Sequence, residues 1–128
     1  MKHHSPAFLK LIEETKKNIK EISTLTALEA FEAGAALIDI REESEFAAGH
    51  VKGAEHLGKG IIERDIEKKH PDMEKPLYLY CGGGFRSVLA ADNLQKMGYK
   101  NVYSVAGGWG AFKEMNVDIE KEKLSDEN

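Results

Sequence analysis

Short apolar runs of strand character alternate along most of the chain with stretches that have helical spacing. Strands that alternate with helices favour a parallel sheet covered on both faces, so we predict an α/β fold. Gly98 follows the longest helical stretch and is a good left-handed stop for it. The expected strands are 36–40, 54–57, 77–80 and 102–105, and the expected helices are 43–48, 61–69, 86–97 and 109–114.

The beginning of the chain has a different pattern. Ser5 followed by Pro6 is a good helix start, because a hydroxyl cap precedes a proline in the first turn. The positions after it are spaced by four and three, which places them on one helical face, and we interpret residues 1–21 as an amphipathic helical extension. This face consists of Phe8, Ile12, Thr15, Ile19 and Ile22.

A second short helix is expected to begin at Thr26, because Thr26 and Glu29 fit a capping box and Gly34 can end the helix. The domain proper is then predicted to span residues 22–119. Residues 120–128 form a charged tail that we expect to be frayed.

Composition is that of a soluble globular chain, with 41% apolar and 31% charged residues among 128. A net charge of −4 implies no broad basic surface, so nucleic acid is not an expected partner. No apolar run approaches the roughly 20 residues that a bilayer span requires, and the start lacks the order of a secretory signal. We therefore expect a cytoplasmic protein that does not enter a membrane.

Cysteine and histidine usage restricts the chemistry. Cys81 is the only cysteine, so an intrachain disulfide, a CxxC redox pair and a zinc site with several thiolates are excluded. His56 and His70 have no suitably spaced partners, and we predict no metal site.

The strongest chemical signal follows the apolar run 77–80. Cys81 ends this strand, the glycines 82–84 come next, and a helix begins near Arg86. Ligands of α/β sheets bind at the carboxyl ends of strands, and glycines allow successive amides to turn toward one point. The start of the helix and the charge of Arg86 also favour an anion, so we expect a nucleophilic thiolate.

Cys81 and Arg86 are thus the candidate catalytic residues, and an inert buried cysteine beside a tight turn is the alternative. We expect the ring of Phe85 to form one wall of the pocket and the loop amides to contact the substrate. The candidate substrate-binding residues are Gly82, Gly83, Gly84, Phe85 and Ser87.

A group of charged residues also invites an acid–base or metal interpretation. We interpret it instead as an ion-pair and capping framework, because such clusters are more often structural than catalytic. A lone histidine after a glycine is interpreted as a hydrogen-bonding residue that fixes its loop. The group consists of Asp39, Arg41, Glu42, Glu45 and His50.

Three stretches resemble the rhodanese family. Residues 37–54 are similar to its amino-terminal signature, residues 81–87 to its active-site loop, and residues 105–112 to its carboxyl-terminal signature. Lys52 and Phe112 depart from the family, which often has proline and tryptophan there. The resemblance implies a three-layer fold around a parallel sheet of about five strands, a sulfurtransferase activity and no cofactor.

The reaction implied by the resemblance is a double displacement. Cys81 accepts the outer sulfur of thiosulfate or a related small donor as a persulfide, and a thiol or cyanide then accepts that sulfur. Arg86 is the only basic residue of the loop, whereas rhodaneses that favour thiosulfate often have more, so the donor stays open.

Two alternatives share these residues. A non-enzymatic persulfide carrier or sulfur-binding module would hold the sulfur with little turnover. A cysteine phosphatase or arsenate reductase of related fold is less favoured, because those proteins have one more residue between cysteine and arginine than the segment 82–85 supplies. The amphipathic N-terminal helix must also bury its apolar face, on its own domain or in a homodimer.

Overall fold

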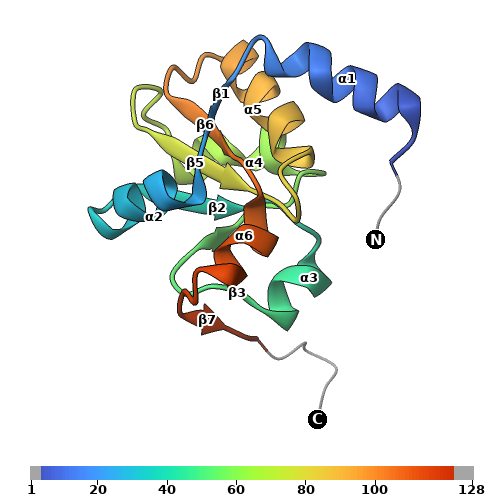
Figure 1. The fold of residues 1–128 in the computed structure, drawn as a ribbon. Coiled ribbons are helices and arrows are strands. Elements are labelled where there is room, and N and C mark those ends of the chain that lie inside the picture. Colours follow the sequence, from blue (N-terminus) through green and yellow to red (C-terminus); the bar gives the residue numbers. More distant parts are fainter. Residues whose placement is uncertain (1–3, 123–128) are drawn as a thin grey trace.

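A computed structural model of the chain describes residues 4–122. Five strands form a central sheet in the order β1-β6-β5-β2-β4, and every neighbouring pair is parallel (Figure 1). The α/β fold with a parallel five-stranded sheet is therefore confirmed. The strands of this sheet are β1 (Lys20–Ile22), β2 (Ala36–Asp39), β4 (Glu55–His56), β5 (Leu77–Tyr80) and β6 (Val102–Val105).

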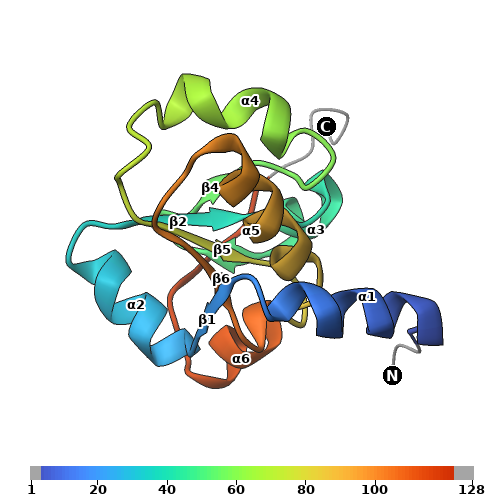
Figure 2. The same cartoon turned by 90° about the horizontal axis from the view of Figure 1, so that it is seen from above.

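Helices cover both faces of the sheet and make it the middle of three layers (Figure 2). On one face, the helices α4 (Ile62–Lys69) and α5 (Arg86–Met97) enclose a buried, mostly aliphatic cluster. On the other face, α2 (Thr24–Glu32) and α6 (Gly108–Glu114) pack on a second cluster that contains buried aromatic side chains. Apolar runs with few polar positions form such strands because both of their faces are buried.

Three smaller elements complete the carboxyl end of the sheet. The helix α3 (Glu43–Ala48) follows β2, and the short strand β3 (His50–Val51) follows α3. Strand β3 pairs antiparallel with β7 (Ile119–Glu120) near the end of the described chain. Glu122 also donates its amide hydrogen to the carbonyl of Ala47 at 2.9 Å. The prediction of a frayed tail is wrong for residues 120–122, and residues 123–128 lie outside the described part.

The N-terminal helix is shorter than its spacing predicts. Helix α1 (Pro6–Lys16) begins after the cap Ser5 as expected, but Lys20–Ile22 form the edge strand β1 of the sheet. Ile22 lies opposite Val105 of β6. Assigning Ile19 and Ile22 to the helical face was therefore wrong. The pairing of β1 with β6 satisfies backbone N–H and C=O groups along the edge of β6, which a continued helix would leave unpaired.

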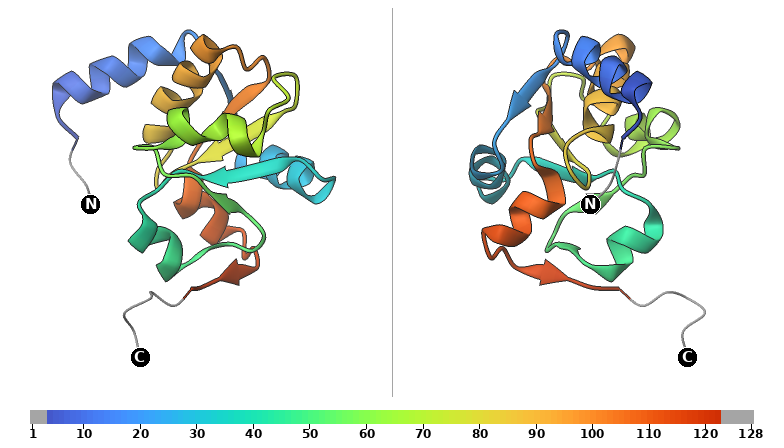
Figure 3. Two further views of the ribbon diagram at one scale, coloured as in Figure 1. Left: turned by 180° about the vertical axis from the view of Figure 1, so that it is seen from behind. Right: turned by 45° about the vertical axis from the view of Figure 1, so that its right-hand side comes forward.

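Helix α1 packs along α5, as the views from above and from behind show (Figures 2 and 3). Ile12 is only 2% exposed at this contact, whereas Leu11 on the outer side is 50% exposed. The side-chain amide of Gln95 donates to the carbonyl of Asn18 at 2.8 Å and ties the end of the extension to α5. The extension thus buries its apolar face on its own domain, and a homodimer through this helix stays a prediction.

Helix α2 begins two residues before the expected start. Ser23 is its cap, and the Ser23 hydroxyl oxygen accepts a hydrogen bond from the amide of Thr26 at 3.1 Å. The capping box predicted at Thr26 was therefore wrong, because a better-placed hydroxyl lies three residues earlier. Among residues 4–122, no helix is long and apolar enough to cross a membrane.

Candidate active site

Cys81 lies directly after β5, at the carboxyl end of the central strand, and is 1% exposed. Its Sγ accepts a hydrogen bond from the amide of Gly84 at 3.2 Å. The Ser87 hydroxyl lies 3.6 Å from the same sulfur and 2.7 Å from the hydroxyl of Ser104 on β6. The sulfur therefore has an amide and a hydroxyl beside it that can donate to an anion, at the end of a strand in the middle of the sheet.

The loop after Cys81 is shaped by the first turn of α6. The amide of Trp109 donates to the carbonyl of Cys81 at 2.7 Å, and the amide of Gly110 donates to the carbonyl of Gly82 at 3.2 Å. In a trans peptide the N–H points opposite to the C=O, so the amides of Gly82 and Gly83 face away from α6. Helix α6 thus orients two peptide units of the loop without occupying their N–H groups.

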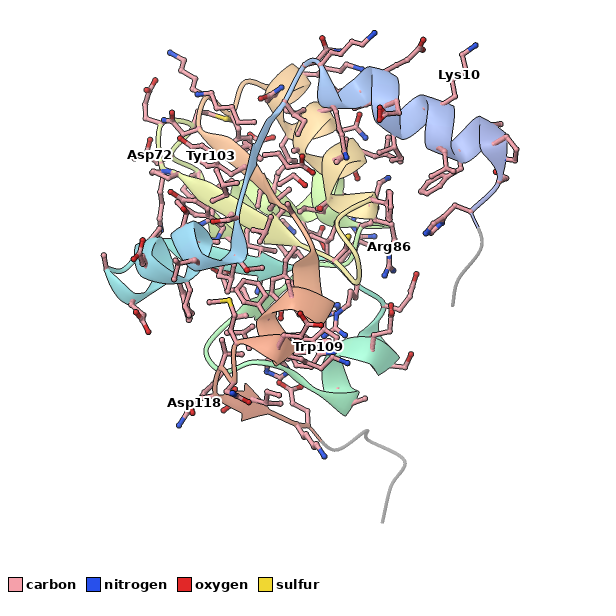
Figure 4. The ribbon with its side chains drawn as sticks, viewed as in Figure 1. Lys10, Asp72, Arg86, Tyr103, Trp109 and Asp118 are labelled. Carbon is pink, nitrogen blue, oxygen red and sulfur yellow. The ribbon has the colours of Figure 1, made fainter. Side chains whose placement is uncertain are left out.

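Arg86, the first residue of α5, forms a two-pronged ion pair with Glu45 of α3. The Nη1–Oε1 distance is 3.2 Å and the Nη2–Oε2 distance is 3.4 Å. The guanidinium lies over Gly82, where an added Cβ would come within 3.3 Å of Nη2. Figure 4 shows the Arg86 side chain extending from the start of α5 toward α3. The arginine of the loop is therefore held by a carboxylate from another part of the chain.

Both partners of this pair stay ionised. Burial alone would lower the pKa of Arg86, but the hydrogen bonds and charge of Glu45 raise that pKa above its ordinary value. Burial would raise the pKa of Glu45, but the hydrogen bonds from Arg86 and from the amide of Glu42 lower it. Glu45 also completes a capping box with Glu42 at the start of α3, which fixes the carboxylate in place.

The charged residues of the predicted framework lie beside this loop. Arg41 donates to Asp39 at 2.7 Å and to the carbonyl of Gly49 at 2.7 Å, and both charged side chains are buried. The guanidinium also lies 4.7 Å from the ring of Trp109 on α6, a residue marked in Figure 4. His50 is bonded to the carbonyl of Phe46 at 2.8 Å. These contacts connect β2, α3 and α6 beneath the loop.

A cavity of about 450 Å³ opens above Cys81. The structure brings most of the predicted site residues to this cavity, whereas Gly84 and Ser87 contact the sulfur without lining the cavity. The lining residues are His4, Phe8, Glu45, Cys81, Gly82, Gly83, Phe85 and Arg86.

Sequence reasoning missed the two lining residues at the start of the chain. Positions 4, 8 and 12 are spaced by four. Phe8 lies on α1 one turn before the buried Ile12, whereas His4 precedes the helix. That spacing could have extended the apolar face back to His4. Nothing in the spacing, however, indicates that this face ends above Cys81.

Comparisons with known proteins agree with the geometry. The family model of the Rhodanese-like domain matches residues 23–115. A thiosulfate sulfurtransferase GlpE of Ectopseudomonas mendocina is 38% identical over 90 residues, which cover 70% of this chain and 81% of that protein.

Two solved structures are similar over nearly the whole chain. The polysulfide-sulfur transferase homodimer of Wolinella succinogenes has a TM-score of 0.77 at 25% identity, with 94% of this chain and 92% of the other covered. The protein RPA3614 of Rhodopseudomonas palustris, named a possible tyrosine phosphatase, has a TM-score of 0.77 at 26% identity, with 94% of this chain and 98% of the other covered.

Proposed function

The chain belongs to the rhodanese-like domain family, and we propose that it transfers sulfane sulfur through a persulfide on Cys81. The observation that carries this proposal is the position of the sulfur. The only thiol of the chain lines the cavity, accepts the amide hydrogen of Gly84 and lies beside the ionised Arg86. A nucleophile with donors arranged around it is suited to covalent group transfer.

In the first step, the Cys81 thiolate attacks the outer sulfur of a donor such as thiosulfate. A bond forms between Sγ and that sulfur, the S–S bond of thiosulfate breaks, and sulfite leaves with the electron pair. Arg86 orients the anionic donor with the N–H groups that Glu45 leaves free. The amides of Gly82, Gly83 and Gly84 stabilise the negative charge on the new outer sulfur.

In the second step, a thiolate or cyanide acceptor attacks the outer sulfur of the persulfide. The Sγ–S bond breaks, its electron pair returns to Cys81, and the sulfur leaves on the acceptor. The same amides then stabilise the thiolate again, so one set of donors serves both half-reactions. These residues supply the whole reaction, and the proposed activity requires no cofactor.

The reaction class is tested by offering both kinds of substrate to one preparation. Thiosulfate with cyanide should yield thiocyanate, and an aryl phosphate should release no phenol above the uncatalysed rate. Only four residues separate Cys81 from Arg86. This loop is one residue shorter than the loop with which cysteine phosphatases surround a tetrahedral oxyanion. Phenol release that depends on Cys81 would assign the chain to phosphatases.

Replacing Arg86 tests its role toward the donor. Arg86→Ala should lower kcat/KM for thiosulfate by about 10- to 100-fold, because a charged hydrogen bond contributes about 1.5–3 kcal/mol. The kcat/KM of Arg86→Lys should lie between the values of the wild type and Arg86→Ala, since lysine keeps the charge but not the planar fork. Steady-state sulfite release gives both values.

The matched control is Arg64→Ala, since Arg64 pairs with Asp65 on the exposed side of α4. This variant should keep the donor kinetics of the wild type. Equal donor kinetics in Arg86→Ala and Arg64→Ala, with both variants folded, would show that Arg86 does not act on the donor.

A further inference from the structure

Part of the cavity wall comes from outside the segment that defines the family. The family match begins at residue 23, whereas His4 and Phe8 precede it. The two rings pack with Phe85 of the loop, with centroid distances of 4.6 Å from His4 to Phe85 and 6.3 Å from Phe8 to Phe85. His4 and Phe8 are themselves 5.3 Å apart. We call these three rings the aromatic wall.

The aromatic wall is held in place by the way α1 is built. The Ser5 hydroxyl accepts the amide hydrogen of Phe8 at 3.2 Å and caps the helix between His4 and Phe8 in the chain. One turn later, Ile12 is buried where α1 packs on α5. Helix α5 begins at Arg86, directly after Phe85. The wall and the loop are therefore attached to the same helix, and the rings are positioned before a ligand arrives.

Size and charge indicate what the wall binds. Cavities of roughly 300–1,000 Å³ with aromatic lining bury organic ligands, and this cavity has about 450 Å³. Cyanide is diatomic and thiosulfate is a compact anion, so neither fills such a space. The cation of the cavity, Arg86, pairs with Glu45 and orients the donor anion, so the aromatic rings are the part of the lining that is left for the carbon group of an acceptor. Aromatic rings contribute by stacking on and burying carbon groups.

We propose that the aromatic wall binds the organic part of a low-molecular-weight thiol acceptor, so that the N-terminal helix makes the site selective for organic thiols with an apolar or aromatic group. This inference rests on the proposed function. The acceptor thiolate attacks the outer sulfur of the Cys81 persulfide while its carbon group lies against Phe8 and Phe85. The new S–S bond forms on the acceptor, and the Sγ–S electron pair returns to Cys81.

The test compares two acceptors at saturating thiosulfate, with sulfite release as the measure of turnover. Phenylmethanethiol is the organic acceptor, and cyanide is the compact one. Phe8→Ala should lower kcat/KM for phenylmethanethiol about tenfold, as expected for removing one apolar contact group from a pocket. The value for cyanide should fall much less, because a diatomic acceptor has no carbon group to bury against the wall.

Three further variants separate the wall from other effects. His4→Ala should act like Phe8→Ala, and His4→Phe should retain the wild-type ratio of the two acceptors, because the ring is kept. Leu11→Ala is the matched control, since Leu11 is on the same helix, is 50% exposed and does not line the cavity. It should leave both acceptors unaffected.

Each contrary outcome has a distinct meaning. An unchanged acceptor ratio in Phe8→Ala and His4→Ala, or an equal loss for both acceptors, overturns the inference while the sulfurtransferase activity stands. The same holds if the wild type uses cyanide but not phenylmethanethiol. A wild-type protein that uses neither acceptor overturns the proposed function, and this inference fails with it.

Discussion

Cys81→Ser is expected to lower sulfur transfer from thiosulfate to cyanide by at least about 10⁴-fold, the range found when an enzyme loses its nucleophile. A hydroxyl does not form a stable bond to sulfane sulfur at neutral pH. No other thiol exists in the chain to replace it. Thiocyanate formation at saturating donor measures the loss.

The serine variant should otherwise keep the structure. Its hydroxyl is smaller than the thiol and can still accept from the amide of Gly84 and approach Ser87. Circular dichroism and the thermal midpoint should therefore stay close to those of the wild type. A folded Cys81→Ser protein that retains more than about a hundredth of the activity would contradict covalent catalysis at this residue.

Gly108→Ala is expected to destabilise the protein by about 3 kcal/mol or more and to impair the active site as well. Gly108 has φ +49°, and an added Cβ would overlap the carbonyl oxygen of Cys81. Relieving that overlap requires α6 or the loop to move, which lengthens the bond from the Trp109 amide to the same carbonyl. A small displacement of a nucleophile can cost about 100-fold in rate.

Two glycine controls separate the sources of this effect. Gly34 has φ +109° but open space around it, so Gly34→Ala reports backbone strain alone, about 1 kcal/mol. Gly110 lies within α6 with ordinary contacts, and Gly110→Ala should be neutral or stabilising. Urea unfolding of the three variants gives the comparison. A Gly108→Ala protein no less stable than Gly34→Ala would show that the close approach of α6 to the Cys81 carbonyl does not limit the stability of the protein.

The parts of the fold and site that depend on neighbouring residues could be predicted from the sequence. The apolar runs of β2, β5 and β6 are strands because a short continuous apolar stretch buries both faces of a sheet. Cys81 and Arg86 lie in one short segment, so their common location follows from the chain itself. The hydrogen bond of His50 to a nearby carbonyl is local in the same sense.

The remainder depends on contacts between distant segments, which periodicity does not encode. The strand β1 forms because β6 has a free edge, although its residues continue a helical spacing. The pairing of Glu45 with Arg86 joins residues 41 positions apart. The placement of His4 and Phe8 over the cavity requires α1 to dock on α5. In each case tertiary contacts decide between conformations that the local sequence pattern favours to a similar degree.

The mass of the protein after exposure to a sulfur donor reports directly whether Cys81 carries a persulfide. The protein is incubated with thiosulfate, freed of excess donor and measured intact. We expect a gain of one sulfur atom, which persists because the chain has no second thiol to displace it, and which cyanide removes. Cys81→Ser should gain nothing. An unchanged wild-type mass after thiosulfate and after inorganic polysulfide, or the same gain in Cys81→Ser, would contradict a persulfide on Cys81.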